Sequence, residues 1–177
     1  TAQTRPLSPY GADKLGCELH AAAAATVHGL RSTGLRFFNV YGPGQDPGSP
    51  YSGVISRFHS LATRGEGLTI FGDGLQTRDF VFVEDVVDAL IASADRRTGP
   101  GAEVLNVCTG RETTVLDLAR HLGDLSGRPV EIAHAEGRAG DIRRSAGNPE
   151  RLARTLGARP ATDLASGLKI LVEHGAG

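Results

Sequence analysis

A tyrosine and a lysine four residues apart are the side chains of this sequence most suited to acid–base chemistry. Tyr10 and Lys14 lie in the segment Ser-Pro-Tyr-Gly-Ala-Asp-Lys, residues 8–14. On a helix this spacing places both side chains on one face. A positive charge beside a phenol favours its ionised form, so Tyr10 could exchange a proton near neutral pH. The spacing alone also occurs by chance on surface helices, so it needs support from other residues.

An arginine near the middle of the chain is suited to bind phosphate. The guanidinium of Arg78 presents a planar fork of N–H donors that matches phosphate oxygens. The next residue is Asp79, so the alternative is a surface ion pair between the two side chains, which would contribute little to stability. The residue type leaves both interpretations open.

These side chains need regular elements to hold them in place. Ser8 and Pro9 are typical of the start of a helix and Gly29 of its end, so a helix between them is expected to carry Tyr10 and Lys14. Further helices are expected at 54–63, 84–94, 115–125 and 163–174, with Thr113 or Thr114 as the cap before residue 115, and strands at 35–40, 68–71, 79–83, 104–108 and 130–133. Strands that alternate with helices predict an α/β protein.

Composition argues against several kinds of partner. Lys and Arg number 19 and Asp and Glu number 20, so the net charge is −1 and no broad basic surface is expected for nucleic acid or anionic lipid. Two cysteines and scattered histidines, without a Cys-x-x-Cys or His-x-x-x-His pattern, predict no disulfide framework and no metal site. No apolar run reaches the ~20 residues of a membrane span and no secretory signal is visible. A cytoplasmic protein is therefore expected.

Six segments occur in an order that resembles one enzyme family. They are Ser8–Lys14, Arg36–Gln45, Leu68–Gly74, Gln76–Val86, Asn106–Gly110 and Gly140–Arg143. Together they resemble the later half of the NAD-dependent nucleotide-sugar epimerases and dehydratases, which are extended short-chain dehydrogenases/reductases, with the UDP-glucose 4-epimerase-like branch as the nearest match. The resemblance covers essentially all 177 residues. It implies one partial domain over residues 1–177: the C-terminal part of an extended Rossmann-type fold with a small α/β substrate-binding subdomain.

The resemblance implies roles for the residues near the cofactor. Tyr10 would exchange a proton with a sugar hydroxyl while hydride passes to NAD. Lys14 would hold the nicotinamide ribose and assist ionisation of the phenol. Phe37 and Phe38 would lie near the nicotinamide, with plain hydrophobic core as the alternative for both.

A second set of residues is implied to bind the substrate, a UDP- or dTDP-hexose. The set is Asn39, Val54, Arg57, Thr69, Phe71, Arg78, Arg138 and Asp141. Within it, Arg78 and Arg138 would contact the diphosphate and Asp141 the nucleoside ribose. Phe71 would pack on the base, unless it is a core residue. Two arginines would neutralise a diphosphate without a metal ion.

One part of the family pattern does not occur in this sequence. The family holds NAD with a strand, a Gly-x-x-Gly-x-x-Gly turn and a helix, and no such turn is found here. We therefore expect the N-terminal dinucleotide-binding half to be missing, the chain to be truncated and inactive, and NAD not to bind to this chain by itself. The intact parent is expected to be a homodimer that pairs through the Tyr10 helix.

Several functions remain open at this point. The Ser or Thr that completes the family's catalytic trio, and the acidic pair that marks its dehydratases, would both precede Thr1. A 4-epimerase is the first interpretation, and a 4,6-dehydratase or decarboxylase is the second. A non-catalytic module that binds nucleotide-sugar or a protein partner is the third. We also expect the isolated chain to be poorly stable or prone to associate, because apolar faces that normally pack on the missing half would be exposed.

Overall fold

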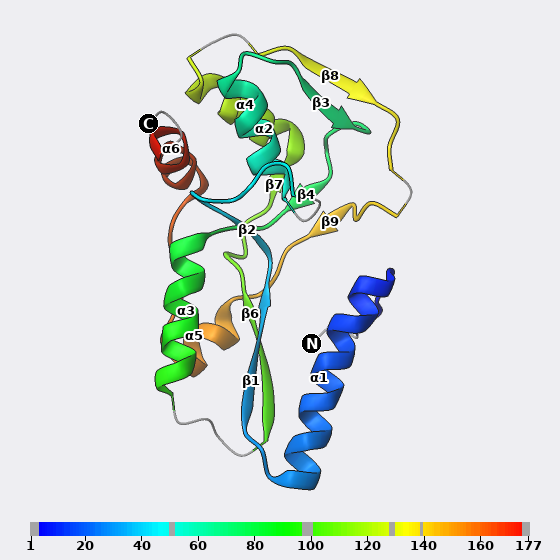
Figure 1. The fold of residues 1–177 in the computed structure, drawn as a ribbon, viewed down its shortest axis with the longest axis vertical. Helices are drawn as coiled ribbons and strands as arrows, with labels where there is room; N and C mark the ends of the chain where they lie inside the picture. Colours follow the sequence, from blue (N-terminus) through cyan, green and yellow to red (C-terminus); the bar gives the residue numbers. More distant parts are fainter. Residues whose placement is uncertain (1–3, 50–51, 97–100, 128–129, 139, 175–177) are drawn as a thin grey trace.

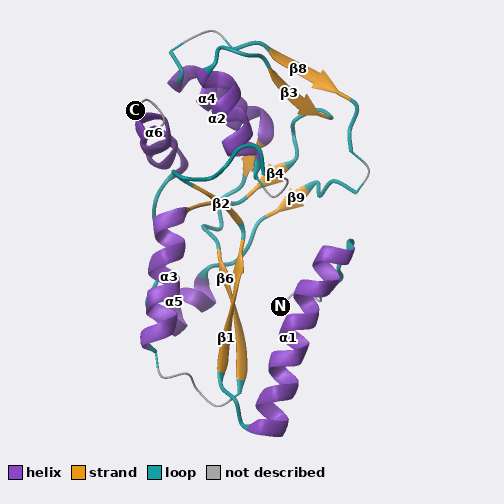
Figure 2. Cartoon of the chain, viewed as in Figure 1, coloured by secondary structure: helices purple, strands orange, loops and turns teal. Residues whose placement is uncertain are grey.

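The computed structural model describes residues 4–49, 52–96, 101–127, 130–138 and 140–174. In chain order its elements are α1 (Pro9–His28), β1 (Ser32–Phe37), β2 (Asn39–Tyr41), α2 (Val54–Thr63), β3 (Leu68–Phe71), β4 (Thr77–Arg78), β5 (Phe80–Phe82), α3 (Val83–Asp95), β6 (Ala102–Val107), β7 (Thr113–Thr114), α4 (Val115–Leu125), β8 (Ile132–Ala135), β9 (Arg144–Ser145), α5 (Glu150–Leu156) and α6 (Leu164–His174). Parallel strand pairs lie among helices (Figures 1 and 2), so the fold is α/β, as predicted. No helix within these ranges is long and apolar enough to cross a membrane.

One half of the molecule is built around the parallel pair β1–β6. The register runs from Ser32 opposite Ala102 to Phe37 opposite Val107. Figure 1 shows α1 along one side of this pair and α3 with α5 along the other. Parallel strands generally have helices on both sides because the crossover connections place them there.

The other half is built around a second parallel pair, β3–β8. Helices α2, α4 and α6 gather beside it, and a small sheet in the order β7–β4–β9 lies between the two halves in Figure 1. In β3 the residues alternate, with Leu68 and Ile70 buried and Thr69 and Phe71 exposed. That alternation sends two of the predicted substrate residues to the surface side of the sheet.

The chain changes strand partner at Phe38. The N–H of Phe38 donates to the carbonyl of Val107 at 3.2 Å, whereas the N–H of Asn39 donates to the carbonyl of Asp79 at 3.0 Å. The predicted single strand at 35–40 is therefore wrong: β1 pairs with β6, and β2 pairs with β5. The predicted strand at 79–83 is shorter in the structure, because β5 covers only Phe80–Phe82, pairs with β2 and is followed directly by α3. The unpredicted β4 precedes it and pairs with β7 and β9.

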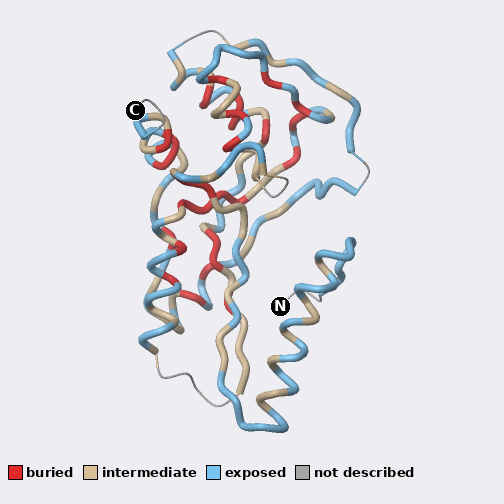
Figure 3. The backbone as a smooth tube through the Cα atoms, viewed as in Figure 1, coloured by how far each residue is buried: buried red, intermediate tan, exposed pale blue. Residues whose placement is uncertain are grey.

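The buried side chains form two clusters. The larger comprises Tyr41, Ile55, Phe58, Leu68, Ile70, Phe80, Phe82, Val115, Leu118, Ala119, Leu122, Leu168 and Leu171. The smaller comprises Val81, Val86, Ala89, Leu105, Val107 and Leu152. Figure 3 shows buried segments in the half around β3 and on the strands that face α3 and α5, with α1 free of them. The half around β3–β8 therefore contains most of the hydrophobic core.

Helix α1 forms where its end signals place it. The Oγ of Ser8 accepts a hydrogen bond from the N–H of Gly11 at 3.1 Å, and Pro9 occupies the first turn. Gly29 ends the helix in the left-handed conformation, with φ 63°, which glycine adopts without steric cost. None of the residues of α1 is buried, so local signals rather than packing define its length.

The remaining sequence-based elements agree with the structure in part. Helices α2, α3, α4 and α6 lie at the predicted places, and Thr114 rather than Thr113 caps α4, accepting from the N–H of Asp117 at 3.0 Å. The strand expected at 130–133 lies at 132–135 as β8. Helix α5 was not predicted; it contributes the fully buried Leu152 to the smaller cluster.

Candidate functional site

The eight residues predicted to bind a nucleotide-sugar all line one cavity. Its volume is about 590 Å³. Asn39 comes from β2, Val54 and Arg57 from α2, Thr69 and Phe71 from β3, Arg78 from β4, and Arg138 and Asp141 from the segment between β8 and β9. Cavities of roughly 300–1,000 Å³ are typical of small-molecule sites. The structure thus brings together residues that span more than a hundred positions of the sequence.

Arg78 is held at the wall of this cavity by an acidic partner. Its side chain is 16% exposed, and its Nη2 lies 2.5 Å from Oδ1 of Asp141. Its Nη1 donates to the carbonyl of Ile142 at 2.6 Å and to that of Thr77 at 2.8 Å. The alternative of a surface ion pair with Asp79 is therefore wrong, because the partner comes from the segment between β8 and β9.

Arg138 and Phe71 form a second contact in the cavity wall. The guanidinium carbon of Arg138 lies 3.8 Å from the centroid of the Phe71 ring, a cation–π geometry. Phe71 is exposed at the end of β3, so the alternative that it is a core residue is wrong. The two arginines bring positive charge to the same cavity as Asp141, and the aromatic ring provides a flat apolar surface there.

Some lining residues were given no role from the sequence. They are Ser52, Phe58, Leu61, Ile70, Gln76, Val115 and Gly140. Gln76 is the most informative, because its Nε2 donates to the carbonyl of Phe71 at 2.9 Å and so holds the end of β3. The motif at 76–86 contains Gln76, but a glutamine before Thr77 carries no signal for this contact in the sequence alone.

Tyr10 and Lys14 lie on one face of α1, as predicted from their spacing. The Nζ of Lys14 lies 5.4 Å from the centroid of the Tyr10 ring, within the range of a cation–π contact. Tyr10 is 64% exposed. Neither residue lines the cavity of the predicted substrate residues; Lys14 instead borders a smaller hollow with Glu18 and Arg36.

An ion pair joins α1 to β1 beside that smaller hollow. Nη2 of Arg36 lies 2.6 Å from Oε2 of Glu18, and Nε of Arg36 lies 2.6 Å from Oε1. These hydrogen bonds lower the pKa of Glu18. The pair orients α1 against the strand, and with it the face that carries Lys14.

The two phenylalanines predicted to lie near the nicotinamide have different environments. Phe37 ends β1 and is 47% exposed, so it is not a core residue. Phe38 is half-buried and packs against the smaller hydrophobic cluster. For Phe38 the structure supports the core alternative, whereas Phe37 has a free surface that a ligand could contact.

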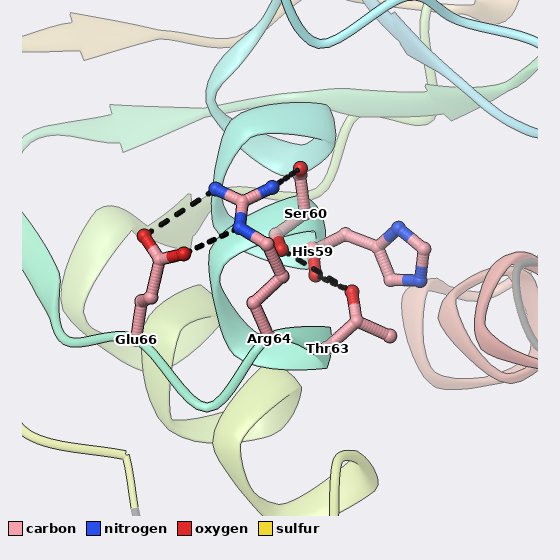
Figure 4. Close-up of polar contacts among 5 residues, drawn as sticks. All are labelled: His59, Ser60, Thr63, Arg64 and Glu66. Atoms are coloured by element: carbon pink, nitrogen blue, oxygen red, sulfur yellow. Dashed lines mark hydrogen bonds and ion pairs between the residues drawn. The ribbon is translucent and has the colours of Figure 1, made fainter.

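A second hollow lies on the other side of α2. Its volume is about 390 Å³, and its walls come from the loop 42–47, from α2 and from α6. Figure 4 shows His59 pointing towards α6, away from the ion pair between Arg64 and Glu66. Burial lowers the pKa of His59, and its Nε2 is buried without a hydrogen-bond partner.

Local polar contacts stabilise the C-terminal end of α2. Nε of Arg64 lies 2.5 Å from Oε1 of Glu66, and its Nη1 donates to Oγ of Ser60 at 2.6 Å (Figure 4). Oγ1 of Thr63 donates to the carbonyl of His59 at 2.5 Å. These contacts complete the last turn of the helix. Across the described ranges, no cluster of three or more His, Cys, Asp or Glu side chains could hold a metal ion.

The parallel strand pairs with helices alongside define an α/β protein of Rossmann type. The model of the NAD dependent epimerase/dehydratase family matches residues 1–108 of the chain. The chain belongs to that family.

Curated relatives and solved structures agree with this assignment. Over 95% of its length the chain is 38% identical to the UDP-glucose 4-epimerase of Mycolicibacterium smegmatis, of which it covers 53%. Over 95% of its length it is 36% identical to a dTDP-glucose 4,6-dehydratase of Streptomyces griseus, of which it covers 50%. The crystal structure of a Thermotoga maritima UDP-glucose 4-epimerase with UDP-glucose matches 97% of the chain at 39% identity, with a TM-score of 0.92, and the chain covers 54% of it.

These relatives show which enzymes the chain resembles and how much of their length it spans. The similar proteins are nucleotide-sugar 4-epimerases, with a dehydratase among them. The chain spans about half the length of the curated relatives that it matches. The activity of the whole protein is therefore a matter for proposal.

Proposed function

We propose that this chain supplies the nucleotide-sugar site and the acid–base pair of an NAD-dependent 4-epimerase that acts on a UDP- or dTDP-hexose. The observation that carries this proposal is the single cavity of about 590 Å³ lined by all eight residues expected to bind such a substrate.

The chemistry of the cavity wall matches the parts of a nucleotide-sugar. Arg78 and Arg138 offer guanidinium donors to a diphosphate, and Asn39 lines the same cavity. Asp141 offers carboxylate oxygens to ribose hydroxyls. The exposed ring of Phe71 offers an apolar surface to the base. Asp141 pairs with Arg78 in the structure, and we propose that the diphosphate replaces this contact.

The acid–base step is assigned to α1. Tyr10 would take the proton of a sugar hydroxyl and later return it, and the ammonium of Lys14, 5.4 Å from the ring centroid, would favour the phenolate. The chemistry that NAD supplies when bound is the reversible acceptance of hydride from a sugar carbon. Lys14 and the exposed Phe37 fit the nicotinamide end of that cofactor, whereas no Gly-x-x-Gly-x-x-Gly turn for its pyrophosphate occurs in the sequence.

Two other functions share the same cavity. The similarity to a dTDP-glucose 4,6-dehydratase favours dehydratase chemistry as the second candidate, because both reactions begin with oxidation of the sugar. A module that binds nucleotide-sugar without turnover is favoured by the absence of the glycine-rich turn from this sequence. We also propose that the complete protein is a homodimer that pairs through α1.

Calorimetric titration of this chain tests the proposal. UDP-glucose or dTDP-glucose is expected to bind, and Arg78→Ala should weaken that binding by about 1.5–3 kcal/mol, the range for a hydrogen bond to a charged group. Arg120→Ala is the matched control, because Arg120 is exposed and pairs with Asp117 on α4, away from the lining residues. If neither nucleotide-sugar binds to the chain, the proposal is refuted. If the chain with added NAD converts the sugar of a UDP- or dTDP-hexose, the alternative of a module without catalysis is excluded.

A further inference from the structure

A buried carboxylate next to the cavity has no role in the function proposed above. Asp79 lies between β4 and β5 and is 0% exposed. Its Oδ1 accepts from the N–H of Thr109 at 2.9 Å and from the hydroxyl of Thr109 at 2.7 Å. Its Oδ2 accepts from the N–H of Gly110 at 2.9 Å and from that of Gly147 at 3.3 Å.

These donors come from two separate segments of the chain. Thr109 and Gly110 follow β6, and Gly147 follows β9. No ion pair to Asp79 is seen among the described residues, so neutral N–H and O–H groups satisfy this buried charge. A buried carboxylate that lost such donors would carry a large desolvation cost, which makes the arrangement of the three segments strongly dependent on this side chain.

The same residue is connected to the part of the cavity that carries Asn39 and Arg78. The carbonyl of Asp79 accepts the N–H of Asn39 at 3.0 Å, at the point where the chain leaves β1 for β2. Arg78 precedes Asp79 in the chain. Gly147 belongs to the same stretch as Asp141, the partner of Arg78. Asp79 is therefore hydrogen-bonded to the backbone of Asn39 and adjacent to Arg78 in the chain, without lining the cavity itself.

The opposite end of the cavity is supported differently. Thr69 and Phe71 belong to β3, which pairs with β8, and the carbonyl of Phe71 is held by Gln76. The hydrogen bonds of the Asp79 carboxylate go to neither strand. A change at Asp79 should therefore disturb the polar end and leave the aromatic end in place.

We propose that Asp79 is a positioning residue for the diphosphate end of the nucleotide-sugar site. It acts through Asn39 and Arg78, and it does not touch the ligand. This inference rests on the proposed function, because it concerns the ligand assigned to the same cavity.

The test compares ligands with and without a diphosphate. Affinities of UDP-glucose, UDP and uridine are measured for the wild-type chain, Asp79→Asn and Asp79→Ala, with the folded fraction of each variant checked by circular dichroism. Asp79→Ala should weaken UDP and UDP-glucose by about tenfold or more, the scale of a lost hydrogen bond to a charged group. Asp79→Asn should be intermediate, because its amide oxygen can still accept from Thr109. Uridine should bind all three proteins within about twofold.

Asp85→Asn is the matched control. The Asp85 carboxylate also accepts from two backbone N–H groups, those of Ala161 at 3.2 Å and Thr162 at 3.1 Å, and it lies outside the cavity lining. Its loss should lower stability and leave the affinity for UDP unchanged. An equal loss of UDP affinity in this control would overturn the proposal, because general loosening of the fold would then explain both results.

The remaining outcomes also decide the question. Folded Asp79 variants that bind UDP within twofold of wild type, or that lose uridine and UDP to the same extent, would overturn the positioning role. If both Asp79 variants fail to fold, Thr109→Val removes the hydroxyl that donates to Asp79 and accepts from the N–H of Arg111. It should weaken UDP, but not uridine, by about threefold or more, because a hydrogen bond to a carboxylate is worth more than a neutral one; unchanged UDP binding in that variant would overturn the role. A wild-type chain that binds no UDP-glucose would instead refute the proposed function, and the inference with it.

Discussion

Arg78 and Asp79 are neighbours in the chain whose charges are satisfied in different ways. Arg78 faces the cavity and pairs with Asp141, whereas Asp79 is fully buried and binds backbone N–H groups. Between β4 and β5 the side chains alternate in direction, so adjacent residues have opposite surroundings. A carboxylate in the interior also affects groups near it, and Cys108 is one of them.

The two cysteines should differ sharply in reactivity. Burial, together with the nearby charge of Asp79, raises the pKa of Cys108 to about 12, so its thiol stays protonated at pH 8 and forms little of the nucleophilic thiolate. Cys17 is exposed on α1. Titration of the native chain with Ellman's reagent at pH 8 should modify one thiol rapidly, and the denatured chain should show two.

Cys17→Ser is the control for this assignment. It should remove the rapid phase and leave the slow modification of Cys108 unchanged. Rapid modification of two thiols in the native chain would show that Cys108 is accessible and would contradict the buried arrangement.

Among the elements, α6 packs against the larger hydrophobic cluster at very short distance from β2. A Cβ at Gly167 of α6 would lie 2.1 Å from the phenolic oxygen of Tyr41. The Tyr41 ring is buried against Phe80 and Phe82, and burial raises the pKa of its phenol. Only glycine permits α6 to lie this close to β2.

Gly167→Ala should therefore destabilise the fold. The added methyl group must displace α6 or the Tyr41 ring, and such overpacking typically costs about 1–3 kcal/mol. Urea unfolding followed by circular dichroism measures the change in the free energy of unfolding. Gly16→Ala on α1 is the control, because nothing lies within 4 Å of its added Cβ, and it should be neutral or stabilising by about 0.5–1 kcal/mol. Equal stabilities for the two variants would contradict the close approach of α6 and Tyr41.

At the scale of the whole molecule, the half around β1–β6 presents apolar side chains that nothing in the described structure covers. On α1, Leu19 and Val27 are exposed, and on α3, Leu90 and Ile91 are exposed. This half also contains the smaller of the two hydrophobic clusters. This half should therefore be the less stable one, and its helices the surfaces through which chains associate.

The isolated chain should associate in a concentration-dependent way through α1. Sedimentation velocity over a range of concentrations should show dimers or larger species, and the double variant Leu19→Glu with Val27→Glu should shift the distribution towards monomer. The double variant Leu90→Glu with Ile91→Glu on α3 is the control and should have the smaller effect. A monomer at every concentration, with a sharp concentration-independent melt, would contradict the expectation.

The sequence predicted the fold class and most of the helices because their signals are local. Ser8, Pro9 and Gly29 mark the ends of α1 without help from tertiary packing. The division between β1 and β2 at Phe38 has no such signal, because it depends on a change of partner from β6 to β5. Helix α5 was missed for a similar reason: it is short, has no side-chain cap and is stabilised by burial of Leu152.

The sequence by itself determined the family, the pair Tyr10 and Lys14 on one helical face, and eight of the residues that line the candidate site, because motifs and spacing are carried by the order of residues. Only the tertiary structure decided that Arg78 pairs with Asp141 and that Asp79 is buried beneath the site. Both results depend on contacts between segments that lie some 30 to 70 residues apart. Such contacts are set by how strands pair and pack, and the types of neighbouring residues do not specify them.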